Sequence, residues 1–264
     1  MRIGRWIGVW AICLLMAGCA GMDGGANHQA KTALAPTGKL RVAFLLAPIY
    51  ATKNATTGEL NGVAVDLGKE LARRLEVPFE PVTYTGAPAL IGDAKTGKWD
   101  IVLTGISPER AVEIDFSPPY MEAEQGCLVR SGAAIASVTD LDQPGIRIGM
   151  LEKSFADAPL SRSTKSATIV RTKTLGELYA LLESGNADAI VSGKTGLFAA
   201  AAKISGARVL DGRILSEPIG IGVPKGRIPA ASEHVSRFVA EVRSNGSVGA
   251  LIDKAGLRGV VVAR

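Results

Sequence analysis

Apolar and polar positions alternate along the chain with two periods, and these predict its secondary structure. Short apolar runs predict strands at 40–46, 79–84, 100–104, 147–151, 168–171 and 187–191. Apolar residues three or four positions apart predict helices at 66–75, 87–95, 155–161, 175–184, 194–204, 230–244 and 247–255. Asp66 is expected to cap the first of them. Strand and helix in turn indicate an α/β fold in which mostly parallel sheets are flanked by helices.

Two apolar segments indicate how the chain is divided. Residues 124–129 follow a Pro-Pro-Tyr corner, and residues 218–223 lie between two prolines. If both are crossing strands, the middle of the chain forms an inserted lobe. Lobe 1 then comprises 38–126 plus 219–264, and lobe 2 comprises 127–218. No internal repeat is evident in the sequence.

The N-terminus resembles a targeting signal. Arg2 and Arg5 precede an apolar run at 6–17, which is too short to span a bilayer and suits a secretory signal peptide at 1–18. The run leads into Ala-Gly-Cys19, which resembles the bacterial lipobox. This implies an exported chain anchored to a membrane through lipid on Cys19. The alternative is an ordinary signal peptide with an accidental cysteine. Residues 19–37 predict a flexible tether.

Composition excludes several classes of function. The chain has 264 residues, a net charge of +5 and 47% hydrophobic residues, so it is a folded globular protein. Only 5% of residues are aromatic and positive charge is spread out, so no nucleic-acid partner is expected. Two histidines are too few for most histidine-built metal sites, and we expect no metal or cofactor. Phosphate-loop, nucleophile-elbow and C-x-x-C motifs are missing, so no catalytic residues are assigned.

The segment 99–110 carries the most chemistry. A buried strand is predicted to end at Thr104 and Gly105, Ser107 can cap a new helix, and Arg110 falls in its first turn. A guanidinium binds a carboxylate through two parallel hydrogen bonds, and the Thr104 hydroxyl adds a donor. The alternative is a well-capped helix whose arginine faces solvent.

Neighbouring motifs favour the ligand-binding role of Arg110 over the solvent-facing one. Gly-Val-Ala-Val-Asp-Leu at 62–67, Ser-Pro-Glu-Arg at 107–110 and Asp-Phe-Ser-Pro-Pro-Tyr at 115–120 occur in order. Gly-Asn-Ala-Asp-Ala at 185–189 and Gly-Val-Pro-Lys-Gly at 222–226 follow. Together they resemble the family 3 extracellular solute-binding proteins, the polar-amino-acid receptors of ABC importers. The resemblance implies a monomeric two-lobed periplasmic-binding-protein clamshell, with two crossing hinge strands and an ABC permease as partner.

The same resemblance implies ligand contacts. Arg110 matches the arginine that holds the ligand α-carboxylate, and Ser154 matches a hydroxyl at a helix start in lobe 2. Tyr50 lies near the place of an aromatic lid. The remaining expected ligand contacts are Thr104, Gly105, Ser107, Tyr120 and Glu124.

The amine partners depart from the family pattern. No acid follows the first strand, and Gly193 followed by Lys194 stands where a second acid is usual. Glu122 or Glu124 could substitute from the hinge, because a buried unpaired ammonium is costly. Alternatively, Glu124 is a hinge residue paired with a nearby Arg or Lys. A ligand without an amine, with a second negative charge near Lys194, also stays possible.

Three functions are compatible with these features. The first is a receptor that captures a small carboxylate or amino acid by lobe closure, without chemistry. The second is an exported enzyme similar to the cyclohexadienyl dehydratases, which would need an acid of raised pKa beside Arg110. The third is a ligand-sensing subunit of a membrane receptor. We expect the first.

Overall fold

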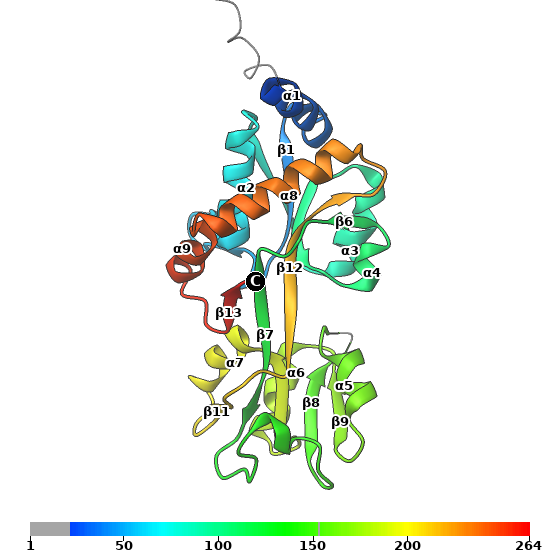
Figure 1. The fold of residues 1–264 in the computed structure, drawn as a ribbon. Helices are drawn as coiled ribbons and strands as arrows, with labels where there is room; N and C mark the ends of the chain where they lie inside the picture. The colour runs from blue at the N-terminus through cyan, green and yellow to red at the C-terminus, as the bar shows by residue number, and fades with distance from the viewer. Residues whose placement is uncertain (1–21, 153) are drawn as a thin grey trace, which may run out of the picture.

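A computed structural model describes residues 22–152 and 154–264, which fold into two lobes, one above the other in Figure 1. The predicted signal peptide and Cys19 lie outside the described residues. The six predicted strands and seven predicted helices are present, each within three residues at every boundary.

Each lobe contains a parallel sheet. In lobe 1, β1 (Leu40–Leu45) lies between β4 (Phe79–Tyr84) and β5 (Ile101–Gly105). In lobe 2, β8 (Arg147–Leu151) lies between β9 (Thr168–Thr172) and β10 (Ala189–Gly193). The central strands bury side chains on both faces because helices cover both, as the alternation of strands and helices predicted.

Two long strands join the lobes. β7 (Met121–Val129) and β12 (Leu215–Pro224) pair antiparallel with each other through Met121–Gln125 and Leu215–Ile219. Farther along, β12 pairs with β5 and β7 pairs with β10, so the order β4-β1-β5-β12-β7-β10-β8-β9 runs through both lobes. Figure 1 shows the two strands passing between the lobes. This confirms the two-lobed α/β fold with crossing strands.

The helices divide between the lobes. Lobe 1 carries α2 (Val63–Arg74), α3 (Ala87–Gly92), η1 (Asp93–Thr96), α4 (Pro108–Ala111), α8 (Pro229–Ser244) and α9 (Ser247–Lys254). Lobe 2 carries η2 (Val138–Asp140), α5 (Asp157–Ser163), α6 (Leu175–Glu183) and α7 (Lys194–Ala201). Five short strands were not predicted: β2 (Thr52–Lys53), β3 (Leu60–Asn61), β6 (Ile114–Phe116), β11 (Arg208–Val209) and β13 (Val260–Val262).

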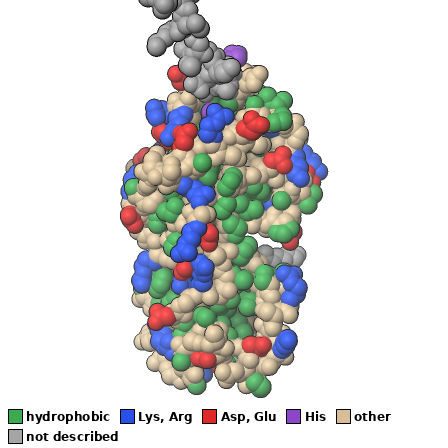
Figure 2. Space-filling view, viewed as in Figure 1, with side chains coloured by type: hydrophobic (Ala, Val, Ile, Leu, Met, Phe, Trp, Pro, Cys, Tyr) green, Lys and Arg blue, Asp and Glu red, His purple; other side chains and the backbone are tan. Residues whose placement is uncertain are grey.

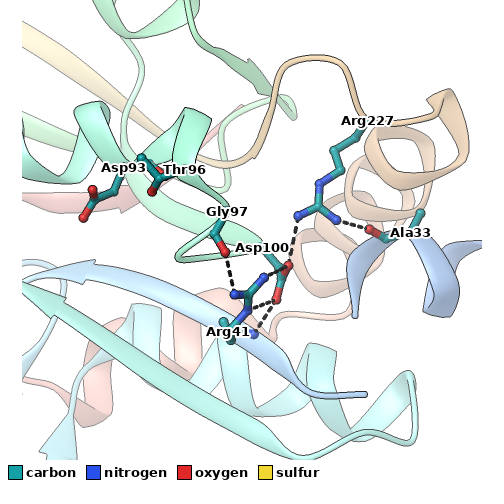
Figure 3. Close-up of polar contacts among 7 residues, drawn as sticks. All are labelled: Ala33, Arg41, Asp93, Thr96, Gly97, Asp100 and Arg227. Atoms are coloured by element: carbon teal, nitrogen blue, oxygen red, sulfur yellow. Dashed lines mark hydrogen bonds and ion pairs between the residues drawn. The ribbon is translucent and has the colours of Figure 1, made fainter. Parts of the chain in front are cut away.

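Residues 22–34 differ from the flexible tether predicted for 19–37. Met22–Leu34 forms α1, which packs on α8, and Leu34 is fully buried. Arg227 donates to the carbonyl oxygen of Ala33 and to Asp100, which ties the end of α1 to the body of lobe 1 (Figure 3). The sequence did not predict this helix because the segment contains two glycines and few apolar residues. The helix is therefore stabilised by packing and not by its own composition.

The prediction that Asp66 caps a helix is wrong. α2 begins three residues earlier, with Gly62 at the N-cap position and a φ of 140°. A β-carbon at Gly62 would collide with the carbonyl oxygen of Tyr50, so the close approach requires glycine. Asp66 lies in the first turn and accepts a hydrogen bond from Lys254 at 2.8 Å.

A nine-residue unit occurs once in each lobe, at 97–105 and 185–193. Each unit starts with a glycine at positive φ, places an aspartate three residues later and continues as the strand β5 or β10. In lobe 1, Asp100 accepts from the backbone N–H of Arg41 at 3.0 Å and from its Nε at 2.9 Å. In lobe 2, Asp188 accepts from the same two groups of Arg147, at 2.8 and 3.1 Å.

The structure therefore shows a short repeat that was not evident in the sequence. Within the unit, only the first glycine, the aspartate and the final glycine are identical, and the paired arginines lie on other strands. The repeat makes the ends of β5 and β10 equivalent: Thr104-Gly105 in lobe 1 corresponds to Ser192-Gly193 in lobe 2.

Candidate functional site

Arg110 is held at the end of β5 by three other predicted site residues. The Ser107 side chain accepts from the backbone N–H of Arg110 at 3.3 Å and caps the single turn of α4. Nη1 of Arg110 donates to the Thr104 hydroxyl at 3.2 Å and to the Gly105 carbonyl oxygen at 2.7 Å. Within the described residues, Nε and Nη2 of Arg110 have no acceptor, so the fork that binds a carboxylate bidentately stays unused.

Tyr50 and Tyr120 belong to the core of lobe 1, and Tyr50 contacts the end of β5. The Tyr50 hydroxyl accepts from the backbone N–H of Gly105 at 3.2 Å, and the residue is 6% exposed. Burial raises the pKa of Tyr50, and nearby Glu217 adds to the effect. Tyr120 is fully buried, and its hydroxyl has no partner among the described residues. In this structure, both rings are buried, so neither lies over the site as an exposed lid.

Glu217 is the functional candidate that sequence reasoning missed. It lies on β12 opposite Ala123, and its Oε2 accepts from Nε2 of Gln125 at 3.3 Å. Burial raises the pKa of Glu217, while the positive charge of Arg110 and the Tyr50 hydroxyl act in the opposite direction. The predicted strand began at 218, one residue too late to include it.

Glu122 and Glu124 belong to the other face of β7. Side chains alternate along a strand, so both point away from the face that carries Gln125. Glu124 accepts from Nζ of Lys194 at 2.7 Å, and Glu122 accepts from the Ser216 hydroxyl at 2.5 Å. In this structure, Glu124 makes the hinge ion pair that we considered as its alternative role.

Ser154 lies in lobe 2, across the hinge from Arg110. Its backbone N–H donates to the carbonyl oxygen of Leu151 at 3.1 Å, after the end of β8. Its hydroxyl is buried without a hydrogen-bond partner in the described part of the chain. Such a group is uncommon in a native fold, and it is available to a ligand or to a rearranged lobe.

No group of three or more His, Cys, Asp or Glu side chains among residues 22–152 and 154–264 is arranged to hold a metal ion. The helices of these residues all fall short of the length and apolarity needed to cross a membrane. On the face seen in Figure 2, acidic and basic side chains are interspersed over both lobes.

Two parallel-sheet lobes joined by crossing strands, with a guanidinium at a strand end between them, define a solute-binding clamshell. The chain belongs to the bacterial extracellular solute-binding proteins, family 3, whose pattern matches residues 40–257.

Relatives with curated names and solved structures agree with this. The chain is 27% identical over 254 residues to the ABC transporter glutamine-binding protein of Bacillus subtilis, covering 91% of each chain. A putative ABC transporter binding component from Wolinella succinogenes, complexed with lysine, has a TM-score of 0.69 and 27% identity, covering 82% of this chain and 95% of that one. An ancestral amino-acid-binding protein, described as a precursor of cyclohexadienyl dehydratase, has a TM-score of 0.68 and 29% identity, covering 85% and 97%.

These comparisons confirm the expected class of protein, a solute-binding receptor of ABC transport. These curated relatives are named for binding, and the ancestral structure, although described as a dehydratase precursor, is itself named as an amino-acid-binding protein.

Proposed function

We propose that this protein captures an amino acid outside the cytoplasmic membrane and delivers it to the membrane subunits of an ABC importer. The observation that carries the proposal is the anchored guanidinium of Arg110. Its Nη1 is fixed by Thr104 and Gly105, and its Nε and Nη2 edge is free for the ligand α-carboxylate. A donor pair held in place before binding loses little conformational entropy when the ligand arrives.

Capture is completed by lobe closure. The ends of β5 and β10 are equivalent in the repeat, and on this proposal Ser192 and Gly193 are the lobe 2 residues that meet a ligand held on lobe 1. The unpartnered Ser154 hydroxyl is a further lobe 2 contact. A ligand that bridges both lobes favours the closed state over the open one.

The proposal includes the arrangement of the chain. Lobe 1 comprises 38–126 and 219–264, and lobe 2 comprises 127–218. These boundaries are supported by β7 and β12, which cross between separate cores, and α1 adds to lobe 1. Lipid on Cys19 holds the monomer at a membrane beside its permease, which the sequence of 1–19 supports.

Thermal unfolding of residues 20–264 against the twenty proteinogenic L-amino acids tests this function. A ligand at 100 times its Kd adds about 2.7 kcal/mol of stability, which shifts the melting temperature by several degrees. We expect such a shift with at least one amino acid and its loss in Arg110→Ala. Arg73→Ala is the matched control, because Arg73 pairs with Glu70 on the exposed surface of α2. No shift with any amino acid, or a shift that survives in Arg110→Ala, would refute the proposal.

One observation favours a second function. Glu217 is an acid of raised pKa beside Arg110, the feature that a dehydratase-like enzyme requires. Incubation with prephenate and measurement of phenylpyruvate tests it in the same preparation. We expect no product, because the relatives are named as binding proteins.

A further inference from the structure

Glu217 and Arg110 present opposite charges across Gly105. A β-carbon built on Gly105 would lie 2.9 Å from Nη1 of Arg110 and 3.0 Å from the carboxyl carbon of Glu217. The nitrogen and the carboxyl carbon are therefore separated by at most the sum of these distances, 5.9 Å. No ion pair joins them among the described residues, so each charge is near the other without being neutralised by direct contact.

The free Nε and Nη2 of Arg110 lie about 2.3 Å from Nη1, so this edge is at most roughly 8 Å from the carboxyl carbon of Glu217, a span within which an α-amino acid fits. In such a ligand the ammonium nitrogen and the carboxylate carbon lie about 2.5 Å apart, across one carbon atom. Hydrogen bonds of about 3 Å then place the groups that hold them roughly 4–7 Å apart. The terminal nitrogen of an extended lysine side chain lies more than about 6 Å from its carboxylate, so its partner would be farther from Arg110.

The other acids near the hinge are occupied. Glu124 is paired with Lys194, and Glu122 accepts from Ser216, both on the opposite face of β7. Glu217 has two neutral hydrogen-bond partners within the described chain, the amide of Gln125 and the hydroxyl of Tyr50, and it is partly buried. A buried carboxylate without a cationic partner is costly, and a ligand ammonium supplies that partner.

We propose that Glu217 is the counter-charge for the ligand α-ammonium and that it restricts the site to α-amino acids. Arg110 holds the carboxylate, Glu217 on β12 holds the ammonium, and Gly105 leaves room between them. A carboxylate without an amine gains the contact to Arg110 but brings its negative charge close to that of Glu217, and this repulsion rejects it. This inference rests on the proposed function, since it assigns the second charge of the same site.

Glu217→Gln tests the inference, because it keeps the shape of the side chain and removes the charge. The probes are two matched pairs: L-glutamine with glutaramic acid, and L-arginine with 5-guanidinopentanoic acid, each pair differing only in the α-amine. Dissociation constants are measured by titration calorimetry for the wild type, Glu217→Gln, Glu124→Gln and Arg110→Ala. Circular dichroism of each variant verifies folding.

We expect the wild type to bind an L-amino acid far more tightly than its des-amino partner. Glu217→Gln should weaken the amino acid at least tenfold and leave the des-amino acid unchanged or tighter. Glu124→Gln should keep the wild-type ratio of the two dissociation constants, and Arg110→Ala should lose both ligands.

Two results would overturn the inference and leave the proposed function standing. The first is that Glu217→Gln keeps the wild-type ratio of the dissociation constants of the des-amino acid and the amino acid. The second is that Glu124→Gln loses this ratio instead. A wild-type protein that binds none of the twenty L-amino acids overturns both together.

Discussion

Nη1 of Arg110 donates to the carbonyl oxygen of Gly105 at 2.7 Å, so the guanidinium is oriented by the strand end before a ligand arrives. The planar fork can then meet a carboxylate with its other edge, which a lysine ammonium cannot imitate. We predict that Arg110→Lys keeps the positive charge but weakens amino-acid binding about 10- to 100-fold, the loss of one charged bidentate contact.

Titration calorimetry with the amino acid found in the thermal screen measures this. Thr104→Val is the milder comparison, since it removes one hydrogen bond of 3.2 Å to the same nitrogen. Affinity of Arg110→Lys within twofold of wild type would show that charge alone matters and that the fork geometry does not.

Gly105 and Gly193 occupy equivalent ends of the repeat but have different surroundings. A β-carbon at Gly105 collides with the carboxylate of Glu217, whereas at Gly193 the nearest side-chain atom, Nε2 of Gln125, is 3.8 Å away. We predict that Gly105→Ala lowers the free energy of unfolding by about 1–3 kcal/mol through overpacking, while Gly193→Ala stays near wild type. Urea unfolding of both variants measures the difference. Equal stability of the two would mean that Glu217 moves aside freely.

The two aspartates of the repeat allow a matched test of buried charge. The side chain of Asp100 is fully buried between Arg41 and Arg227, whereas that of Asp188 is 22% exposed beside Arg147. Removing one partner of a buried pair leaves an uncompensated charge, so Asp100→Asn should cost about 3 kcal/mol. Asp188→Asn should cost about 1 kcal/mol, because water screens its partner. Denaturant unfolding measures both values, and the reverse order would contradict the assignment of burial.

The sequence predicted those features of the structure that depend on residues close together in the chain. Strand and helix periods, the cap at Ser107 and the arginine three residues later are all encoded within a few neighbouring residues, and the structure has them. The crossing strands were found because prolines and apolar runs marked them.

Contacts between distant segments could not be predicted in this way. Glu217 lies 112 residues after Gly105 in the chain. It comes close to Arg110 and Gly105 only because β12 pairs with both β5 and β7. Likewise, α1 is a helix because α8 covers it, and the repeat is visible only once Arg41 and Arg147 meet their aspartates.

The docking of α1 gives a prediction on stability. Leu34 is fully buried at the end of α1, in the core of lobe 1. Leu34→Ala leaves a cavity there and should lower the free energy of unfolding by about 3 kcal/mol. Thr32→Ala is a control on the same helix, because its hydroxyl contacts only a backbone carbonyl at an exposed position. If Leu34→Ala unfolds like the wild type in urea, α1 does not contribute to the folded lobe.

The raised pKa of Glu217 predicts how stability depends on pH. Burial raises the pKa of Glu217 in the folded state above its ordinary value of 4.5. At pH values between 4.5 and this raised pKa, the folded state therefore binds more protons than the unfolded state. The free energy of unfolding therefore falls as pH rises through that window, and the ionised carboxylate destabilises the ligand-free protein at neutral pH. Its neighbours are Arg110 and Tyr50, and Tyr50 stays neutral because burial raises its own pKa.

Glu217→Gln should consequently raise the stability of the ligand-free protein at pH 7, and the difference from wild type should vanish below about pH 4. Urea unfolding at pH 7 and pH 4 measures both. A bound amino acid reverses the order at pH 7, because its ammonium favours the ionised carboxylate that the variant lacks. A ligand-free variant that is less stable than wild type at pH 7 would show that Arg110 already compensates the charge of Glu217, and that no ammonium is needed to do so.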